Sequence, residues 1–285
     1  MDLSVILVNY KMRDALLACM QSVADDAKGL VTEVVVVDNA SGDGSRQAVA
    51  QRFPGARYIA NPDNRGYARA VNQGLAATSG RYALIMNPDC DVKPGAIGAL
   101  VRALDERPER AVAGPKILDG DGRLQYSCRA FPEPSTIFFN RYSLLTVLFP
   151  RNRYSQRYLM LDWDHASARE VDWLSGACMM VRREAVERVG GMDEHFFMFN
   201  EDVDWCRRFK LAGWTVLYEP AAVVVHHVGA SRSKVATKVI VERHKGMIHY
   251  FHKHHPTPAP LSWIVDGVLM MRAGLMVAAN ALRWR

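Results

Sequence analysis

The sequence lacks both of the glycine-rich loops that hold phosphate groups in many nucleotide-binding proteins. Neither G-x-G-x-x-G nor G-x-x-x-x-G-K-[ST] follows a strand-like segment, and the segment NASGDGS after Asp38 does not have the dinucleotide-binding spacing. A Rossmann dehydrogenase and a P-loop NTPase are therefore disfavoured.

Cysteine is scarce as well, and no C-x-x-C pair occurs, which argues against a zinc knuckle and a redox motif. We expect reduced thiols of a cytoplasmic protein, mostly small core residues, at Cys19, Cys90, Cys128, Cys178 and Cys206. The N-terminal segment MDLSVILVNY has no basic region and no small-residue cleavage site. We expect it to form the first strand of a domain rather than a signal peptide.

The charge balance is mildly basic, with a formal net charge of +6 over 285 residues. This excess fits a phosphorylated substrate, an anionic membrane surface or nucleic acid, and charge alone does not choose among them. A nucleic-acid binder should carry a concentrated basic stripe or a stacked-aromatic motif, and neither is clear in the sequence. We therefore expect no nucleic-acid partner.

Strand-like and helix-like segments alternate over the first hundred residues. LSVILVNY, EVVVVDNA, ARYIA and YALIMNP are typical of strands, and residues 13–24, 45–53 and 67–77 are typical of helices. This alternation predicts an α/β fold with a mostly parallel sheet, whose ligands bind beyond the carboxyl ends of the strands. The polar residues found at those ends are Asn9, Asp38, Asn61, Asn64, Asp89 and Asp91.

The remaining sequence is less regular. We expect a helix over 94–106, a hairpin turn at LDGDGRLQ, and no assignable pattern over 129–170. A strand and a helix are expected in 171–191, then a helix capped by Asn200 and ended by Gly213, and then two strands, TVLYEP and AAVVVHH. A basic helix over about 234–254 and an apolar tail over 261–285 complete the chain.

Asp89 and Asp91 form a D-x-D pair directly after a hydrophobic strand. Two carboxylates at this spacing can share one Mg²⁺ or Mn²⁺ ion, which completes its coordination with water and substrate phosphates. An isolated D-x-D is more often a solvated acidic turn. The position at the end of a strand in a β-α-β context favours the metal site.

The order of several motifs resembles family 2 glycosyltransferases, and in particular the bacterial rhamnosyltransferases of that family that build cell-surface polysaccharide. These motifs are VILVNY, VVVVDNASGDGS, NPDNRGYARAVNQG, MNPDCD, WLSGACMMVRRE, FFMFNEDVDWCRR and HHVGASR. The resemblance implies a GT-A fold, in which a Rossmann-like, mostly parallel sheet is flanked by helices, here with a C-terminal helical extension. It also implies a nucleotide-sugar donor, a divalent cation and inversion at the anomeric carbon.

The resemblance also implies a division of the chain. We expect a catalytic domain over 1–255, with its nucleotide-binding half at about 1–115 and its acceptor-binding half at about 116–230. In the donor site, Asp38 would accept a hydrogen bond from N3–H of uracil or thymine, and Asn9 would lie beside the same nucleoside. Asn64 and Arg65 would flank the base and the diphosphate, and Asp89 would face the ribose and the metal.

The metal ligands implied by the resemblance are Asp91, Asp89 and one histidine. We prefer His226 to His227, because His226 lies six residues after Pro220, although a lone histidine is more often structural. Magnesium and manganese both remain open as the ion.

The acidic pair in FNEDVDW resembles the catalytic pair of the family. We expect Asp202 to be the general base and Glu201 to bind the acceptor or orient Asp202. Acidic residues also favour a helix N-terminus through the macrodipole, which is the alternative explanation. Trp173 and Gly176 are expected on the acceptor side, since an aromatic ring stacks well on a sugar, and a core tryptophan is nearly as good an interpretation.

The apolar tail over 256–285 is interrupted by Asp266 and Arg272, so its longest charge-free stretch is shorter than a spanning helix. A helix lying in a membrane interface is one interpretation, and packing on the protein's own body or on a second copy in a homodimer is the other. The interfacial helix would use Trp263, Trp284, Arg283 and Arg285.

The sequence therefore predicts an inverting, metal-dependent glycosyltransferase that moves L-rhamnose from dTDP-rhamnose to a glycan or lipid-linked acceptor. It would be cytoplasmic, with a peripheral contact at the inner face of the cell membrane. A UDP-sugar-dependent enzyme of the same fold is the main alternative. A sugar-nucleotidyltransferase is disfavoured, because VNYKMRDAL stands where that class carries a glycine-rich loop and a lysine. A non-catalytic nucleotide-sugar-binding protein should lack one of the site carboxylates, yet all four are present: Asp89, Asp91, Glu201 and Asp202.

Overall fold

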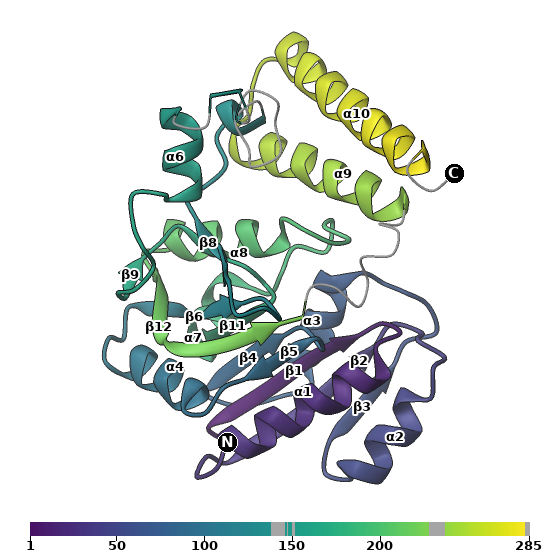
Figure 1. Cartoon of the computed structure of the whole chain (residues 1–285), viewed down its shortest axis with the longest axis vertical. Coiled ribbons are helices and arrows are strands. Elements are labelled where there is room, and N and C mark those ends of the chain that lie inside the picture. Colours follow the sequence, from purple (N-terminus) through teal and green to yellow (C-terminus); the bar gives the residue numbers. More distant parts are fainter. Residues whose placement is uncertain (138–145, 147, 150–151, 228–236, 283–285) are drawn as a thin grey trace.

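A mixed sheet forms the centre of the computed structural model, which describes residues 1–137, 146, 148–149, 152–227 and 237–282 (Figure 1). Among these residues ten strands form the sheet, in the order β3-β2-β1-β4-β11-β6-β12-β5, with β7 beside β6 and β9 beside β12. The strands are β1 (Leu3–Asn9), β2 (Thr32–Asp38), β3 (Arg57–Ala60), β4 (Tyr82–Met86), β5 (Cys90–Val92), β6 (Arg110–Leu118), β7 (Leu124–Gln125), β9 (Arg169–Glu170), β11 (Cys178–Arg182) and β12 (Thr215–His226).

The first four strands of the chain run parallel to one another, so their carboxyl ends share one edge of the sheet. Every residue of β1 is buried, as expected of a parallel strand covered on both faces. Ile6 and Val8 pack into the core on one face, and Leu3, Val5 and Leu7 pack into the core on the other. The predicted mostly parallel α/β sheet is confirmed.

Helices cover both faces of the sheet. Helices α1 (Arg13–Asp26), α2 (Ser45–Arg52) and α4 (Ala96–Asp105) supply the core on one face. Helices α3 (Tyr67–Ala76), α7 (Arg183–Val189) and α8 (Glu201–Leu211) supply the core on the other. The remaining elements are β8 (Cys128–Arg129), β10 (Trp173–Leu174), η1 (Pro134–Ile137), α6 (Arg153–Leu159), α9 (Thr237–His254) and α10 (Ala259–Leu282).

Three details differ from the sequence predictions. TVLYEP and AAVVVHH form one strand, β12, which keeps pairing with β6 across a register shift between Glu219 and Val223. The helix predicted from residue 94 begins at Ala96. Asn200 precedes α8 in the left-handed region, with φ 71°, and its side chain does not cap the helix. It faces the carbonyl of Arg243 at 3.4 Å instead.

The two predicted halves of the catalytic domain share this one sheet. Strand β11, from the second half, lies antiparallel between β4 and β6 of the first half. Removing either half would therefore break strand pairing in the other. The assignment of donor binding to one half and acceptor binding to the other remains a prediction about roles.

Helices α9 and α10 pack on each other as a layer beyond α8 (Figure 1). The ammonium of Lys253, on α9, lies 2.6 Å from Asp193 and 2.9 Å from the fully buried Asp204 of α8. Asp204 also pairs with His254 and with Arg208. Burial opposes ionisation of Asp204, but these partners outweigh it and lower its pKa. The buried Asp204 carboxylate of α8 thus anchors α9 through its contacts with Lys253 and His254.

Candidate functional site

The D-x-D pair and two histidines meet where the short strand β5 pairs with the end of β12. The pairing is antiparallel, with His226 opposite Cys90 and Val225 opposite Asp91. The backbone N–H of His227 also donates to the carbonyl of Asp89 at 2.9 Å. Residues more than a hundred positions apart in the sequence are therefore held together by backbone hydrogen bonds.

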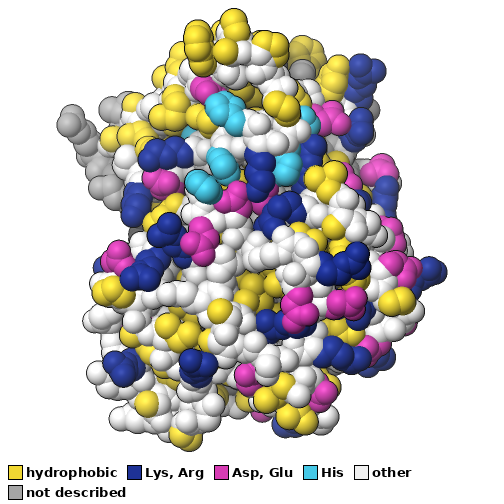
Figure 2. All heavy atoms as spheres, turned by 180° about the vertical axis from the view of Figure 1, so that it is seen from behind, with side chains coloured by type: hydrophobic (Ala, Val, Ile, Leu, Met, Phe, Trp, Pro, Cys, Tyr) yellow, Lys and Arg dark blue, Asp and Glu magenta, His cyan; other side chains and the backbone are white. Residues whose placement is uncertain are grey.

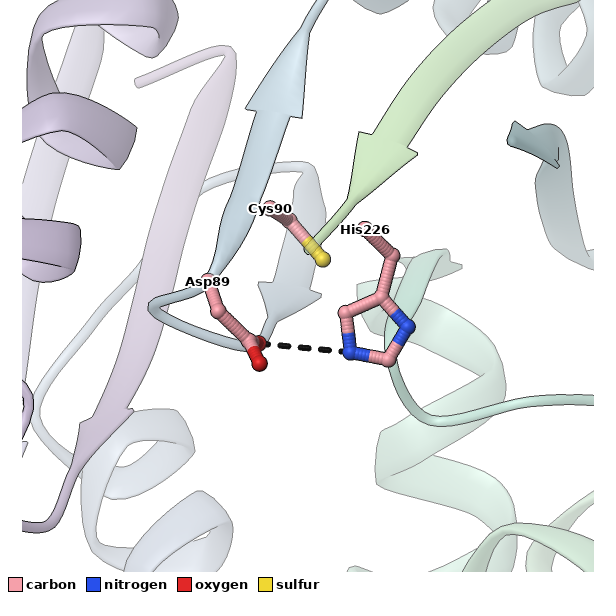
Figure 3. Close-up of side chains that lie close together, drawn as sticks. All are labelled: Asp89, Cys90 and His226. Atoms are coloured by element: carbon pink, nitrogen blue, oxygen red, sulfur yellow. Dashed lines mark ion pairs between the residues drawn. The ribbon is translucent and has the colours of Figure 1, made fainter. Parts of the chain in front are cut away.

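Asp89, Cys90 and His226 point toward one another (Figure 3). Nε2 of His226 lies 3.3 Å from a carboxylate oxygen of Asp89, and both side chains are about 15% exposed. Nδ1 of His226 lies 3.1 Å from the Gln125 side-chain oxygen, and an Nδ1 proton donated to that oxygen would leave Nε2 to bind a metal. Burial raises the pKa of the Cys90 thiol, whose sulfur donates to the carbonyl of Ala177. Asp89 and His226 are therefore the groups of this cluster that could hold a metal ion.

Asp91 has a different histidine partner. Its carboxylate lies 2.7 Å from Nε2 of His227, and both side chains are more exposed than the Asp89–His226 pair. The structure thus matches each histidine with one carboxylate of the D-x-D pair. In the less exposed pair, the second ring nitrogen of His226 contacts the Gln125 side chain. Metal-binding histidines commonly have such a contact, which favours His226 over His227 as the ligand.

Asn9 and Asp38 lie side by side at the ends of β1 and β2. The Asn9 amide nitrogen donates to Asp38 at 2.7 Å and also contacts the hydroxyls of Ser41 and Ser45. Ser41 donates to Asp38 through both its backbone N–H and its hydroxyl. The Asn9 oxygen is buried and has no hydrogen-bond partner in the described structure. The strand ends therefore present a fixed polar platform with one unused acceptor.

Asn64 and Arg65 lie at a cavity of about 560 Å³ near the start of α3. Its lining residues are Asp63, Asn64, Arg65, Arg69, Glu194, His195 and Phe197. The Asn64 side chain accepts the backbone N–H of Gly66, which has φ 88° and approaches the Phe197 carbonyl so closely that a Cβ would clash. The Gly66 carbonyl accepts from Asn39, next to Asp38. This loop therefore joins the strand-end platform to the cavity.

Glu201 is buried and Asp202 is partly buried at the first turn of α8. One oxygen of Asp202 accepts the backbone N–H of Gly176 at 2.8 Å, and the other accepts the N–H of Val203. Burial raises the pKa of Asp202, and these hydrogen bonds moderate the shift. Burial and then the charge of Asp202 raise the pKa of Glu201 well above the ordinary carboxyl range. Burial and the charge of Asp202 therefore favour the protonated form of Glu201, one of whose oxygens has no partner among the described residues.

Tyr67 connects the cavity loop to this acidic pair. Its hydroxyl donates to the Gly176 carbonyl at 2.8 Å, while the Gly176 N–H binds Asp202. A Cβ on Gly176 would contact both side chains at 3.6 Å. Burial, followed by the charges of Glu201 and Asp202, raises the pKa of Tyr67, so the phenol stays neutral. Neither Tyr67 nor Gln125 was singled out in the sequence, because their partners are distant along the chain.

Trp173 lies in the core rather than on an open surface. It is 8% exposed, and its indole N–H donates to the carbonyl of Ala130 at 2.9 Å. The Arg129 guanidinium covers its ring, 5.6 Å from the ring centre. These contacts favour the core alternative over a ring that stacks on an acceptor sugar.

Comparisons with known proteins agree on one family. Residues 4–190 match the family described as "Glycosyl transferase family 2". The "N-acetylglucosaminyl-diphospho-decaprenol L-rhamnosyltransferase" of Mycobacterium tuberculosis is 36% identical over 88% of this chain and 85% of its own length. "Rhamnosyltransferase WbbL" of Escherichia coli is 25% identical over 78% of this chain and 82% of its own length.

A solved structure supports the fold. The "Mannosyltransferase PcManGT from Pyrobaculum calidifontis in complex with GDP-Man and Mn2+" has a TM-score of 0.61 and 20% identity over 98% of this chain and 75% of that chain. At this identity the likeness concerns architecture alone. The fold is of the GT-A type, as predicted.

The buried carboxyl of Glu201 gives a pH-dependent prediction. Its pKa is raised on folding, so wild-type stability is lost as the pH rises above the ordinary carboxyl pKa of about 4. Glu201→Gln removes this loss. The stability difference between variant and wild type should therefore be smallest near pH 4 and grow in favour of the variant toward pH 8, as measured by urea denaturation.

Glu33→Gln is the matched control with the opposite sign. Burial opposes ionisation of Glu33, but hydrogen bonds from Ser79, Ser4 and Gly80 outweigh it and lower its pKa. This variant should lose stability relative to wild type as the pH rises through 4. A Glu201→Gln difference that stays constant from pH 4 to pH 8 would contradict the assignment.

Proposed function

Because the chain belongs to glycosyl transferase family 2, and is therefore a glycosyltransferase, we propose that it transfers L-rhamnose from dTDP-rhamnose with inversion to a lipid-linked saccharide. The mycobacterial relative is named for an N-acetylglucosaminyl-diphospho-lipid acceptor and for L-rhamnose. The similarity extends over most of both chains, which supports the same acceptor class. Such a reaction belongs to cell-wall or surface-polysaccharide synthesis, at the cytoplasmic face of the membrane.

The observation that carries this proposal is the buried Glu201–Asp202 pair fixed against Gly176. An acceptor hydroxyl attacks the anomeric carbon as the dTDP leaving group departs, and the hydroxyl proton must go to a base on the acceptor side. Asp202 is held by backbone N–H groups, and burial raises its pKa toward the range in which a base is effective. Asp202 therefore takes the proton, and Glu201, protonated beside it, donates a hydrogen bond to the acceptor or orients Asp202.

The donor would lie along the ends of the parallel strands. Asp38 and Asn9 form the platform for the nucleobase, and the unused Asn9 oxygen supplies an acceptor there. Asn64 and Arg65, at the neighbouring cavity, would contact the base and the diphosphate. A thymine and a uracil present the same N3–H to this platform, so a UDP-sugar donor is the alternative.

The residues at the β5–β12 junction fit a divalent cation. Two carboxylates and an imidazole nitrogen are a donor set for Mn²⁺ or Mg²⁺, and among the described residues Asp89 and Asp91 have no Lys or Arg partner but lie within ion-pair distance of His226 and His227. Asp89, Asp91 and His226 would hold the ion. When bound, the ion would neutralise charge on the diphosphate leaving group.

The donor and the metal are tested together in a thermal-shift panel. Purified protein is mixed with dTDP, UDP, GDP or ADP, each with Mn²⁺, Mg²⁺ or EDTA. A ligand at 100 times its dissociation constant stabilises the folded state by about 2.7 kcal/mol. We expect the largest metal-dependent shift with dTDP.

His226→Ala should weaken Mn²⁺ binding roughly tenfold or more, since even outer-shell changes typically cost that much.

His227→Ala is the matched control and should leave most of the metal-dependent shift in place. A preference for UDP would keep the enzyme class and overturn the rhamnosyl donor. Loss of the shift in His227→Ala but not in His226→Ala would reverse the ligand assignment.

Asp202→Asn tests the base. The asparagine carbonyl can still accept from Gly176, so the fold and the dTDP affinity should be retained, whereas turnover should fall about 10²–10⁴-fold. Rhamnosyl transfer is measured by mass spectrometry, and dTDP binding by calorimetry. Lost dTDP affinity with unchanged turnover would move Asp202 into the donor site.

The outward face of α10 supports contact with a membrane. Within the described residues one helix, over Ala259–Ala281, is long and apolar enough to cross a bilayer, with mean hydropathy 1.5. Its two charged residues do not face outward: Asp266 bonds to His252 of α9, and burial lowers the pKa of Arg272. The exposed positions are apolar, with Trp263 70% exposed.

This segregation favours a helix lying in the interface over a spanning one. Figure 2 shows the hydrophobic cap at the α10 end of the molecule, with basic side chains beside it. The exposed large side chains of this face are Leu261, Trp263, Ile264, Met270, Met271, Leu275 and Met276. Trp284, Arg283 and Arg285, which were predicted to contribute, lie outside the described residues.

Met271→Glu with Leu275→Glu tests the membrane contact. Both side chains are more than 60% exposed, so the fold should be kept while sedimentation with anionic phospholipid vesicles falls about tenfold or more. Leu211→Glu, which is 74% exposed on α8, is the matched control and should bind vesicles like wild type. Unchanged vesicle binding together with loss of a dimer in light scattering would assign the face to a second copy instead.

A further inference from the structure

Arg129 lies near enough to the proposed base, Asp202, for its charge to contribute to the Asp202 pKa. It belongs to β8, whose pairing with β10 places Arg129 opposite Trp173. Its guanidinium lies 5.6 Å from the Trp173 ring centre and 5.7 Å from that of Tyr158. Two aromatic rings therefore fix the direction of this side chain without using its five N–H donors.

No acidic side chain neutralises Arg129. Across the described residues its guanidinium has no ion pair and donates no hydrogen bond, and its buried Nε has no partner. The residues outside the described ranges include no aspartate or glutamate. A half-buried guanidinium left without an acceptor is costly unless a ligand supplies one.

Other half-buried arginines in the chain are satisfied internally. Arg208 pairs with Asp204, Arg183 donates to the carbonyls of Gly80 and Leu75, and Arg182 donates to the carbonyl of Arg110. These residues join elements of the fold. Arg129 differs because the described residues pack aromatic rings against its faces and place no hydrogen-bond acceptor at its edge.

The surroundings of Arg129 point to the acceptor. From Trp173 the chain runs two further residues to Ser175 and then to Gly176, whose N–H binds Asp202. The positive charge of Arg129 is also one of the causes that lower the pKa of Asp202, behind burial and the backbone hydrogen bonds. The donor platform at Asn9 and Asp38 and the D-x-D residues lie on other elements, β1, β2 and β5. A group held by Arg129 would therefore lie near the base rather than on the elements that carry the donor platform.

We propose that Arg129 binds the anionic diphosphate of the acceptor. This inference rests on the proposed function, in which the acceptor is a saccharide linked through a diphosphate to a lipid. The planar guanidinium matches phosphate oxygens in pairs, and its aromatic neighbours hold it ready for them. Arg129 is thus a specificity residue that distinguishes a diphosphate-linked sugar from a neutral glycoside.

The test compares two acceptors that share one sugar. One is N-acetylglucosaminyl-diphosphate carrying a short prenyl chain, and the other is octyl N-acetylglucosaminide, which has no phosphate. Arg129→Gln should raise KM for the diphosphate acceptor roughly 10- to 100-fold, the cost of a lost charge-assisted contact. KM for the octyl glycoside, and dTDP affinity with Mn²⁺, should change less than threefold. Arg129→Lys should recover part of the loss.

Arg169→Gln is the matched control. Arg169 also covers a tryptophan, with its guanidinium 5.3 Å from the Trp163 ring centre, but it is paired with Asp162. It should leave both acceptor KM values unchanged. Urea denaturation and far-UV circular dichroism verify that both variants fold.

The outcomes separate the possibilities. Equal KM increases for both acceptors would overturn the proposal and give Arg129 a structural role. A weaker dTDP affinity with unchanged acceptor KM would assign the guanidinium to the donor diphosphate. A shifted pH–rate profile with unchanged KM would restrict it to controlling Asp202. Failure of the wild-type enzyme to use either acceptor would contradict the proposed function but leave open whether Arg129 binds an anion. That question is then decided by a thermal shift with inorganic pyrophosphate. Stabilisation of the wild type that is lost in Arg129→Gln would support the anion site, and equal stabilisation of both proteins would overturn it.

Discussion

The antiparallel pairing of β5 with the end of β12 is the constraint on which the site depends. Strand β5 has only three residues, and its partner β12 ends at His226, directly before His227. Because β12 also pairs in parallel with β6, the position of its end is set by the whole sheet. The register shift between Glu219 and Val223 lets one strand satisfy both neighbours. A shift of one residue in the β5 pairing would turn both aspartates away from the histidines.

Three acidic residues in the first turn of α8 show how environment separates roles. Asp204 is surrounded by Arg208, Lys253 and His254 and stabilises the fold as an ion. Asp202 is bonded to backbone N–H groups only, and Glu201 has a buried oxygen with no described partner. The helix macrodipole favours all three equally and cannot explain these differences. The unpaired burial of Glu201 is a stability cost of the kind that functional sites commonly carry.

Local patterns predicted much of this molecule. The alternation of apolar runs with helical segments predicted the parallel strands, and the polar residues at the strand ends predicted the edge of the sheet at which Asn9 and Asp38 lie side by side. What depends on long-range pairing could not be predicted. The insertion of β11 between β4 and β6, the matching of His226 with Asp89, and the aromatic support of Arg129 all join segments far apart in the chain. Asn200 failed as a side-chain cap because its position requires a left-handed backbone, which the cap preference does not reveal.

Helix α9 links the outward apolar face to the chemistry. It packs against α10 on one side, and on the other Lys253 joins Asp193 to Asp204, two residues after the proposed base. In the proposed reaction a lipid-linked acceptor would be bound at both ends, with its lipid in the membrane and its sugar at Asp202. The enzyme would therefore need to hold the base at a fixed height above the membrane surface. A rigid connection through a buried, multiply paired carboxylate meets that requirement better than a loop, because such contacts cannot slide without leaving a charge unpaired.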